Sequence, residues 1–185
     1  MVSTNDMRPG QTLDIDGKLF TITYYQHVKP GKGQAFVKTK LKNVKTGAVV
    51  DRTFRADERV NVAVLDKREM QYLYTDDAGL VFMDSETYEQ VHVDPELLGD
   101  SVKFLKDGVV CMVPVYEGTP IGAEMPIAME LEITDTEPGM KGDRVSGALK
   151  PATVETGAIV QVPLFIEPGE RIKVDTRTGE YMSRA

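Results

Sequence analysis

Short strand-like runs separated by turn signals recur along the chain, and this spacing restricts the fold more than any other feature. The runs 13–15 and 18–25 flank Asp16-Gly17, which is a strong signal for a two-residue β-hairpin turn. Short helical turns are favoured at 94–99 and at 101–106, and no long segment has the helical period, which argues against an α/β fold with crossover helices. The sequence therefore predicts an all-β protein. Further strand-like runs lie at 35–44, 49–55, 71–74, 80–83 and 89–93.

Strand number and turn spacing predict three small β-domains. Residues 1–64 have the length and strand spacing of an SH3-like barrel. Two later segments, 107–116 and 156–165, share a glycine, an apolar run and a Val-Pro pair at an offset of 49 residues. Such a repeat indicates two related β-modules with the size of five-stranded OB-folds, although chance similarity between two strands is the alternative. We therefore expect domains at 1–64, 65–128 and 129–185.

Charge is distributed unevenly along the chain. The formal net charge is −7, which by itself argues against a nucleic-acid partner. Residues 1–64, however, carry 11 basic and 6 acidic side chains, whereas residues 65–128 carry 4 and 13, and residues 129–185 carry 7 and 10. A basic first third can meet a phosphate backbone while the acidic middle third is repelled by it. Independent drift of the segments would produce the same imbalance, so both interpretations stay open.

The residue types that most enzymes and metal sites need are scarce. One cysteine, Cys111, and two widely separated histidines, His27 and His92, exclude an internal disulfide framework and a multi-thiolate metal site. Cys111 lies in an apolar run, so we expect a buried thiol. The sequence contains no P-loop, nucleophile elbow or zinc-protease motif. We therefore predict no catalytic residue, no metal, no cofactor and no enzymatic activity.

A group of carboxylates offers one alternative to that prediction. Paired carboxylates can act as the acid and the base of a glycoside hydrolase. Side chains of this kind also cap turns and cover solvated surfaces, and turn chemistry explains them better here. A hydrolase would need Asp84 or Glu86 for its activity. The carboxylates that lie in or beside predicted turns are Asp76, Asp77, Asp84, Glu86 and Glu89.

The start of the chain and its hydropathy bear on location. The first residues lack the basic and apolar regions of a signal peptide. No apolar run approaches the roughly 20 residues of a membrane-spanning helix. We therefore expect a soluble cytoplasmic protein without a membrane partner.

A cationic loop joins two of the predicted strands. Pro30 fixes its own φ, and Gly31 and Gly33 permit positive φ, so a tight tip is expected. Lys32 would project from this tip between residues of almost no bulk, so that its amine can enter a narrow crevice. Lys29 adds a second cation at the base of the loop.

Three further lysines alternate with other residues on the strand after the loop. The period of two places Lys38, Lys40 and Lys42 on one face. A stripe of this kind suits a phosphate backbone. The alternative is an ordinary hairpin with a solvated lysine face, which the pattern alone favours slightly.

Three motifs give the chain a family resemblance. The segment 28–36, with the sequence VKPGKGQAF, resembles the lysine-tip loop of bacterial translation elongation factor P. The closing segment 179–184, GEYMSR, is similar to the last strand of that family. Both ends of the chain match, so the resemblance covers essentially the whole sequence. The residues that follow the family's C-terminal signature are Lys150-Pro-Ala152, Gly157, Val160-Gln-Val162-Pro163, Ile166 and Gly169.

The resemblance implies a fold and a set of partners. The fold would be an N-terminal SH3-like (KOW-like) barrel followed by two OB-folds, with an L-shaped, tRNA-like outline. The protein would bind both subunits of the ribosome between the peptidyl-tRNA and exit sites, and would contact peptidyl-tRNA and ribosomal RNA. It would relieve stalling at consecutive prolines without being an enzyme. A monomer suits this binding cleft.

The resemblance also assigns roles to residues. Lys32 would reach toward the CCA end of peptidyl-tRNA, and in many members an enzyme extends the equivalent lysine by aminoacylation, whereas other members leave it unmodified. Pro30, Gly31 and Gly33 would shape the loop. Tyr181 and Arg184 match family residues at the C-terminus and would contact RNA backbone, although a tyrosine near a terminal strand is more often a packing residue. The RNA-backbone contacts on the first domain would come from Lys29, Lys38, Lys40 and Lys42.

A binding module of another class is the alternative function. OB-folds also bind RNA, oligosaccharides and peptides outside the ribosome. Such a module would bind its ligand without any dependence on ribosomes, and co-sedimentation with ribosomes separates the two hypotheses.

Overall fold

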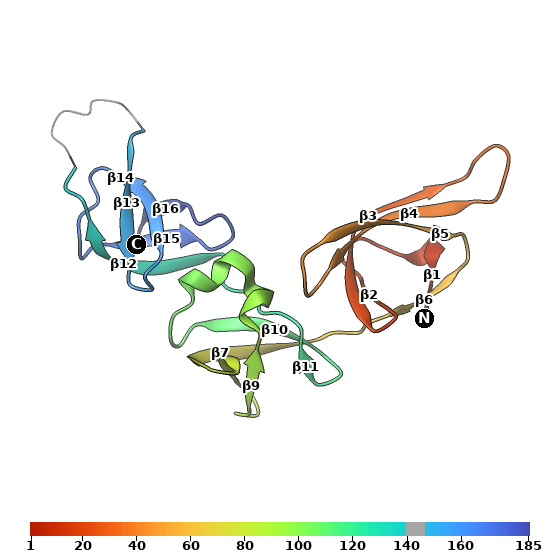
Figure 1. Ribbon diagram of the computed structural model, residues 1–185, viewed down its shortest axis with the longest axis horizontal. Coiled ribbons are helices and arrows are strands. Elements are labelled where there is room, and N and C mark those ends of the chain that lie inside the picture. The colour runs from red at the N-terminus through yellow and green to blue at the C-terminus, as the bar shows by residue number, and fades with distance from the viewer. Residues whose placement is uncertain (140–146) are drawn as a thin grey trace. The chain divides into compact units, whose positions relative to one another are not determined.

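The computed structural model describes residues 1–139 and 147–185 and consists of three antiparallel sheets (Figure 1). The all-β prediction is confirmed. Contacts divide the chain into two compact units, one formed by Met1–Arg68 with Val113–Ala123, the other by Glu69–Met112 with Glu124–Ala185. No helix in the described residues is long and apolar enough to cross a membrane.

The first sheet has six strands in the order β1-β6-β2-β3-β4-β5. The turn between β2 and β3 has positive φ at both Asp16 (53°) and Gly17 (76°), as the predicted two-residue hairpin requires. The core beneath the sheet contains Leu13, Ile22 and Val37, each almost fully buried. The elements are β1 (Val2–Ser3), η1 (Thr4–Asp6), β2 (Thr12–Ile15), β3 (Lys18–Val28), β4 (Phe36–Asn43), β5 (Val49–Arg55) and β6 (Arg59–Val62).

The second sheet has the strand order β11-β10-β7-β8-β9 and carries the helical turns. The predicted turn at 94–99 is the first half of η2. Asp94 caps this element by accepting from the backbone N–H of Glu96 at 3.0 Å, and Pro95 occupies the first helical turn. Gly99 breaks the helical geometry with a φ of 58°. The elements are β7 (Asp66–Asp76), β8 (Gly79–Asp84), β9 (Gln90–Val93), η2 (Pro95–Phe104), β10 (Val110–Tyr116) and β11 (Thr119–Pro120).

The third sheet has the order β14-β13-β12-β15-β16. The five strands of each sheet can be numbered from one to five along the chain. In both the second and the third sheet, neighbouring strands then follow the order 3-2-1-4-5. This shared order supports the inference of two related five-stranded modules. The elements are β12 (Ala128–Thr136), β13 (Leu149–Val154), β14 (Ile159–Pro163), β15 (Arg171–Asp175) and β16 (Tyr181–Arg184).

The alignment of 107–116 with 156–165, which suggested the two modules, is wrong, because the two segments are not equivalent strands. Residues 107–116 contain β10, the fourth strand of its module, whereas 156–165 contain β14, the third strand of the other. The two segments look alike because both begin with a turn glycine at positive φ, Gly108 (84°) and Gly157 (86°), and continue into a half-buried strand. Those requirements are local and hold for many strands after a tight turn.

Phe104 at the end of η2 completes the core of the third sheet. It is only 1% exposed and packs with buried residues of β12 to β15, including Leu131 and Val160. Removing a buried phenylalanine ring costs about 3–5 kcal/mol. Thr156 holds the same segment, because its hydroxyl donates to the carbonyl oxygen of Lys103 at 2.7 Å. The helical element and the third sheet are therefore packed as one body within their unit.

A candidate nucleic-acid interface on the β3–β4 hairpin

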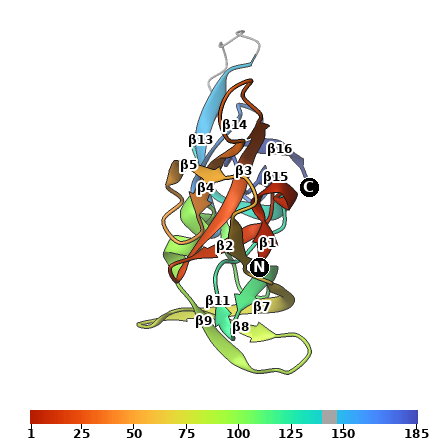
Figure 2. The same ribbon diagram turned by 90° about the vertical axis from the view of Figure 1, so that its right-hand side faces the viewer.

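The β3–β4 hairpin extends beyond the other strands of its sheet (Figures 1 and 2). Its last cross-strand pair is Val28 with Phe36, so residues 29–35 form the connecting segment, which we call the tip loop. Residues 29–34 are all exposed. Lys32 therefore lies on the exposed tip, as predicted, and among the described residues it has no hydrogen-bonding or ionic partner.

The backbone of the tip loop fits its glycines. Gly33 has a φ of 106°, in the region that side chains rarely adopt, so a residue with a Cβ is strained there. Gly31 needs no such freedom, since its φ is not in that region and a Cβ would meet nothing within 4 Å. Pro30 is exposed and limits the motion of the loop through its fixed φ.

Lys38, Lys40 and Lys42 share one exposed face of β4, which we call the lysine face. Burial alternates along this strand, and the three lysines are exposed while Val37, Thr39 and Leu41 between them are buried. Cross-strand neighbours on β5 add one carboxylate to the lysine face, because Asp51 lies opposite Lys40. The prediction of a one-sided stripe is therefore confirmed, whereas its role in binding RNA stays a prediction.

The two candidate residues near the C-terminus are held by neighbours in their own unit. The guanidinium of Arg184 lies with Nε 3.0 Å from Oε2 of Glu170, and stacks 4.7 Å above the ring of Phe165. Tyr181 is half-buried and packs against the core of the third sheet. Sequence reasoning missed Glu170 and Phe165 as partners of Arg184. The register of β15 and β16, in which Ile172 lies opposite Arg184, is the signal that brings Glu170 close.

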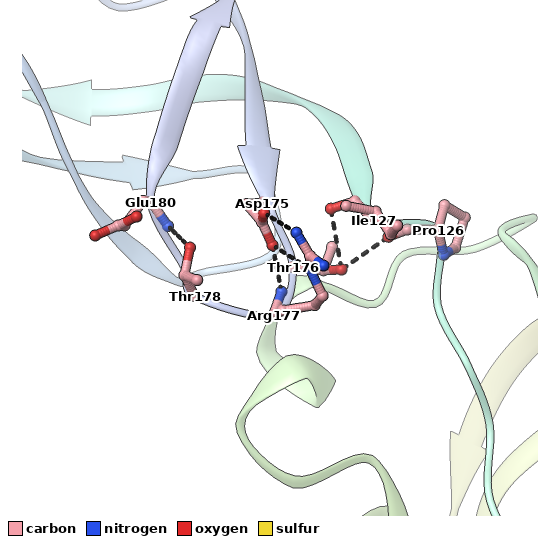
Figure 3. A network of polar contacts seen from close by, with 7 residues as sticks. All are labelled: Pro126, Ile127, Asp175, Thr176, Arg177, Thr178 and Glu180. Atoms are coloured by element: carbon pink, nitrogen blue, oxygen red, sulfur yellow. Dashed lines mark hydrogen bonds and ion pairs between the residues drawn. The ribbon is translucent and has the colours of Figure 1, made fainter. Parts of the chain in front are cut away.

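The turn before β16 is fixed by a network of polar contacts (Figure 3). The Thr176 hydroxyl donates to the carbonyl oxygen of Pro126 at 2.7 Å, which ties the turn to the start of β12. Arg177 Nη2 lies 2.8 Å from Oδ2 of Asp175, and the backbone N–H of Arg177 donates to Oδ1 at 2.9 Å. The side-chain and backbone hydrogen bonds from Arg177 lower the pKa of Asp175 from 3.8 to about 2. The strand that carries Tyr181 and Arg184 thus follows a well-fixed turn.

The turn carboxylates are explained by turn chemistry. Oδ1 of Asp76 accepts from the N–H of Ala78 at 2.9 Å, and its Oδ2 lies 2.9 Å from Nε2 of His92. Oδ1 of Asp84 accepts from the N–H groups of Glu86 and Thr87, at 2.8 and 3.1 Å. Asp77, Glu86 and Glu89 are exposed. Among the described residues there is also no group of three or more His, Cys, Asp or Glu that could hold a metal ion.

Cys111 is buried, as predicted. Burial raises the pKa of its thiol to about 11, so the thiolate is scarce at neutral pH. This is the environment of an unreactive core cysteine.

Family models match the chain in three consecutive segments. Residues 3–60 match the elongation factor P KOW-like domain, residues 65–123 match the elongation factor P OB domain, and residues 129–184 match the elongation factor P C-terminal model. The first two descriptions agree with the six-stranded barrel-like sheet and with the five-stranded module that follows it.

Full-length relatives and solved structures agree with these matches. The chain is 57% identical to elongation factor P of Acidothermus cellulolyticus over 185 residues, covering 100% of this chain and 99% of the relative. It is 55% identical to elongation factor P of Moorella thermoacetica, covering 100% of both. The eukaryotic translation initiation factor 5A from Methanococcus jannaschii has a similar fold, with a TM-score of 0.57 and 22% identity, covering 67% of this chain and 91% of that one.

Proposed function

The chain belongs to the elongation factor P family of translation elongation factors, and we propose that it acts on the ribosome through Lys32. In this proposal it binds between the peptidyl-tRNA and exit sites and steadies the CCA end of peptidyl-tRNA. It thereby stimulates peptide-bond formation where consecutive prolines stall the ribosome. The observation that carries the proposal is the position of the Lys32 amine, which has no partner among the residues that the structure describes, at the exposed end of an extended hairpin.

The proposed mechanism needs no catalytic group on the protein. Proline reacts poorly because its ring restricts the geometry of attack. Holding the tRNA end in a productive pose removes an entropic part of the barrier. Each tenfold gain in rate needs only about 1.4 kcal/mol, which a cationic tip and a few backbone contacts can supply. The peptide bond itself is made by the ribosome, so the factor is not an enzyme in this proposal.

Other residues support Lys32 in this proposal. Pro30, Gly31 and Gly33 shape the tip loop. The phosphate contacts come from Lys29 and from the lysine face. Tyr181 and Arg184 are proposed to contact RNA backbone at the C-terminal end, where RNA phosphate would compete with Glu170 for the Arg184 guanidinium.

The proposal also fixes domains, partners and location. The functional domains are 1–64, 65–128 and 129–185, which act as a monomer in the cytoplasm. The partners are both ribosomal subunits, peptidyl-tRNA and ribosomal RNA. An enzyme that extends the Lys32 amine is a further proposed partner, and the exposure of Lys32 is compatible with such an enzyme.

Replacing Lys32 tests the proposal directly. In a reconstituted translation system, we expect Lys32→Ala to lower the rate of polyproline synthesis at least tenfold and to leave proline-free synthesis unchanged. Lys45→Ala is the matched control, since it removes an exposed lysine from another turn of the same unit. Unchanged polyproline synthesis in Lys32→Ala would remove the proposed role of the tip. Failure of the wild-type protein to co-sediment with ribosomes would favour the binding-module alternative.

A further inference from the structure

A β-bulge in β3 decides which side chains face the lysines of β4. The cross-strand register shifts between Ile22, which lies opposite Leu41, and Tyr24, which lies opposite Lys40. Strict alternation from Ile22 would put Tyr24 in the core. The extra residue, Thr23, exchanges the two faces, so that Tyr25 packs against the core and Tyr24 faces solvent.

Tyr24 thereby joins the lysine face. Its neighbour across the strands is Lys40, and Gln26, two residues further along β3, lies opposite Lys38. Tyr24 is 45% exposed, and its phenol donates to Oε1 of Gln26 at 3.1 Å, which fixes the ring along the strand. A second aromatic residue, Phe36, lies at the end of the same face with Nζ of Lys38 5.8 Å from its ring centroid.

We propose that Tyr24 and the lysine face form a stacking site for an unpaired RNA nucleotide, an inference that rests on the proposed function. Successive lysines on one face of a strand are about 7 Å apart, so they can follow a phosphate backbone. An exposed ring among such cations offers the flat surface on which proteins stack single-stranded bases. The net positive charge of this face also favours a polyanion such as RNA, because three lysines face one carboxylate, Asp51.

A second exposed tyrosine, Tyr74, provides an internal control for this site. Tyr74 follows a second bulge, in β7, where the register shifts between Tyr72 and Tyr74. It is 48% exposed, close to the value for Tyr24. Its surroundings differ, since its cross-strand neighbour is Val81 and the next residue but one along the strand is Asp76, which is paired with His92. A tyrosine with equal exposure but without lysines is therefore available as a control.

The chain has no tryptophan, so a single substitution creates a selective fluorescent probe. We expect the emission of Tyr24→Trp to be quenched when a tRNA acceptor-stem minihelix ending in unpaired CCA is added, and the emission of Tyr74→Trp to stay constant. Equal responses of the two variants would overturn the proposal, because the ring at position 24 would then have no special contact with RNA.

A second measurement separates stacking from charge. Tyr24→Ile keeps a strand-forming residue but has no ring, and we expect it to weaken minihelix binding about tenfold without changing the salt dependence. Tyr24→Phe should bind like the wild type. Removing Lys38, Lys40 and Lys42 should instead reduce the salt dependence. Wild-type affinity in Tyr24→Ile, together with weaker binding in the lysine variant, would overturn the stacking site and leave the proposed function standing. Failure of the proposed function is recognised separately, by unchanged polyproline synthesis in Lys32→Ala.

Discussion

The β3–β4 hairpin and the β7–β8 hairpin each contain a β-bulge, after Ile22 in the first and after Tyr72 in the second. In both hairpins the bulge turns one tyrosine outward, while another, Tyr25 or Tyr72, faces inward. The outward tyrosine of the first hairpin lies opposite Lys40, whereas that of the second lies opposite Val81, with Asp76 two residues further along β7. Both hairpins therefore use a β-bulge to expose a tyrosine, and the side chains around each tyrosine determine which ligands its ring can bind.

The two turns differ as well. The tip loop has seven residues outside the strands, exposed glycines and ample space around Gly31. The β7–β8 turn is tight, and Gly79, which follows it as the first residue of β8, is packed, because a Cβ there would lie 2.8 Å from the carbonyl oxygen of Val93. An exposed, open loop suits a segment that enters a partner's crevice. A tight turn followed by a packed glycine suits a segment that holds its own sheet together.

The largest expected effect tests this contrast between the turns. Gly79→Ala adds a methyl group against the Val93 carbonyl at a φ of 133°, so we expect a loss of about 3 kcal/mol in the free energy of unfolding. Gly31→Ala has open space and no positive φ, and it should change the free energy by less than about 0.5 kcal/mol. Urea unfolding followed by circular dichroism measures both. Equal losses would show that the tip loop is as constrained as the β7–β8 turn.

The next effect tests the contrast in charge. Replacing Lys38, Lys40 and Lys42 by alanine removes the lysine face, and at about 0.1 M salt the affinity for ribosomes should fall about a hundredfold, or ~2.7 kcal/mol. The control replaces three exposed cations elsewhere in the same unit, Lys18, Lys45 and Arg59.

Both triple variants change the net charge by the same amount, so only the position of the removed charges differs. Sedimentation with ribosomes at several salt concentrations gives the affinities and their salt dependence. A similar loss in the control variant would show that net charge, and not the lysine face, governs binding.

Local patterns predicted much of the fold and of the hairpin. Alternation placed Lys38 and Lys40 on one face, and Asp16-Gly17 fixed a hairpin turn, because both signals depend only on neighbouring residues. The glycines and the proline of the tip loop predicted an exposed Lys32 for the same reason. The roles of these residues on the ribosome stay predictions.

Features that depend on distant parts of the chain were missed. The bulge at Thr23 is defined by the pairing of β3 with its partner strand β4. A strict period of two along β3 alone would therefore place Tyr24 in the core. The burial of Phe104 depends on a sheet that begins 24 residues later, at Ala128. The segments 107–116 and 156–165 matched because of local turn chemistry, although their strands occupy different positions in the two modules.

The smallest expected effect is a pH dependence of stability that belongs to the β7–β8 hairpin and not to the β3–β4 hairpin. The pKa of Asp76 is lowered from 3.8, first by its hydrogen bond with His92 and next by the backbone N–H of Ala78. A lowered pKa in the folded state means that this carboxylate contributes stability above its unfolded pKa and loses it as the pH falls through the folded value. The contribution should therefore be complete at neutral pH, begin to fall as the pH approaches the ordinary aspartate value of 3.8, and be lost as the pH drops through the lowered folded pKa.

His92→Ala tests how much the hydrogen bond with His92 lowers the pKa of Asp76. We expect the pKa of Asp76, followed by carbon NMR of its carboxyl group, to rise toward its ordinary value while the backbone hydrogen bonds keep it slightly low. The β3–β4 hairpin serves as the reference and should show no change, since Asp76 and His92 lie on the strands β7 and β9 of the second sheet. An unchanged pKa of Asp76 would mean that the backbone hydrogen bonds of the β7–β8 turn, and not His92, stabilise the carboxylate.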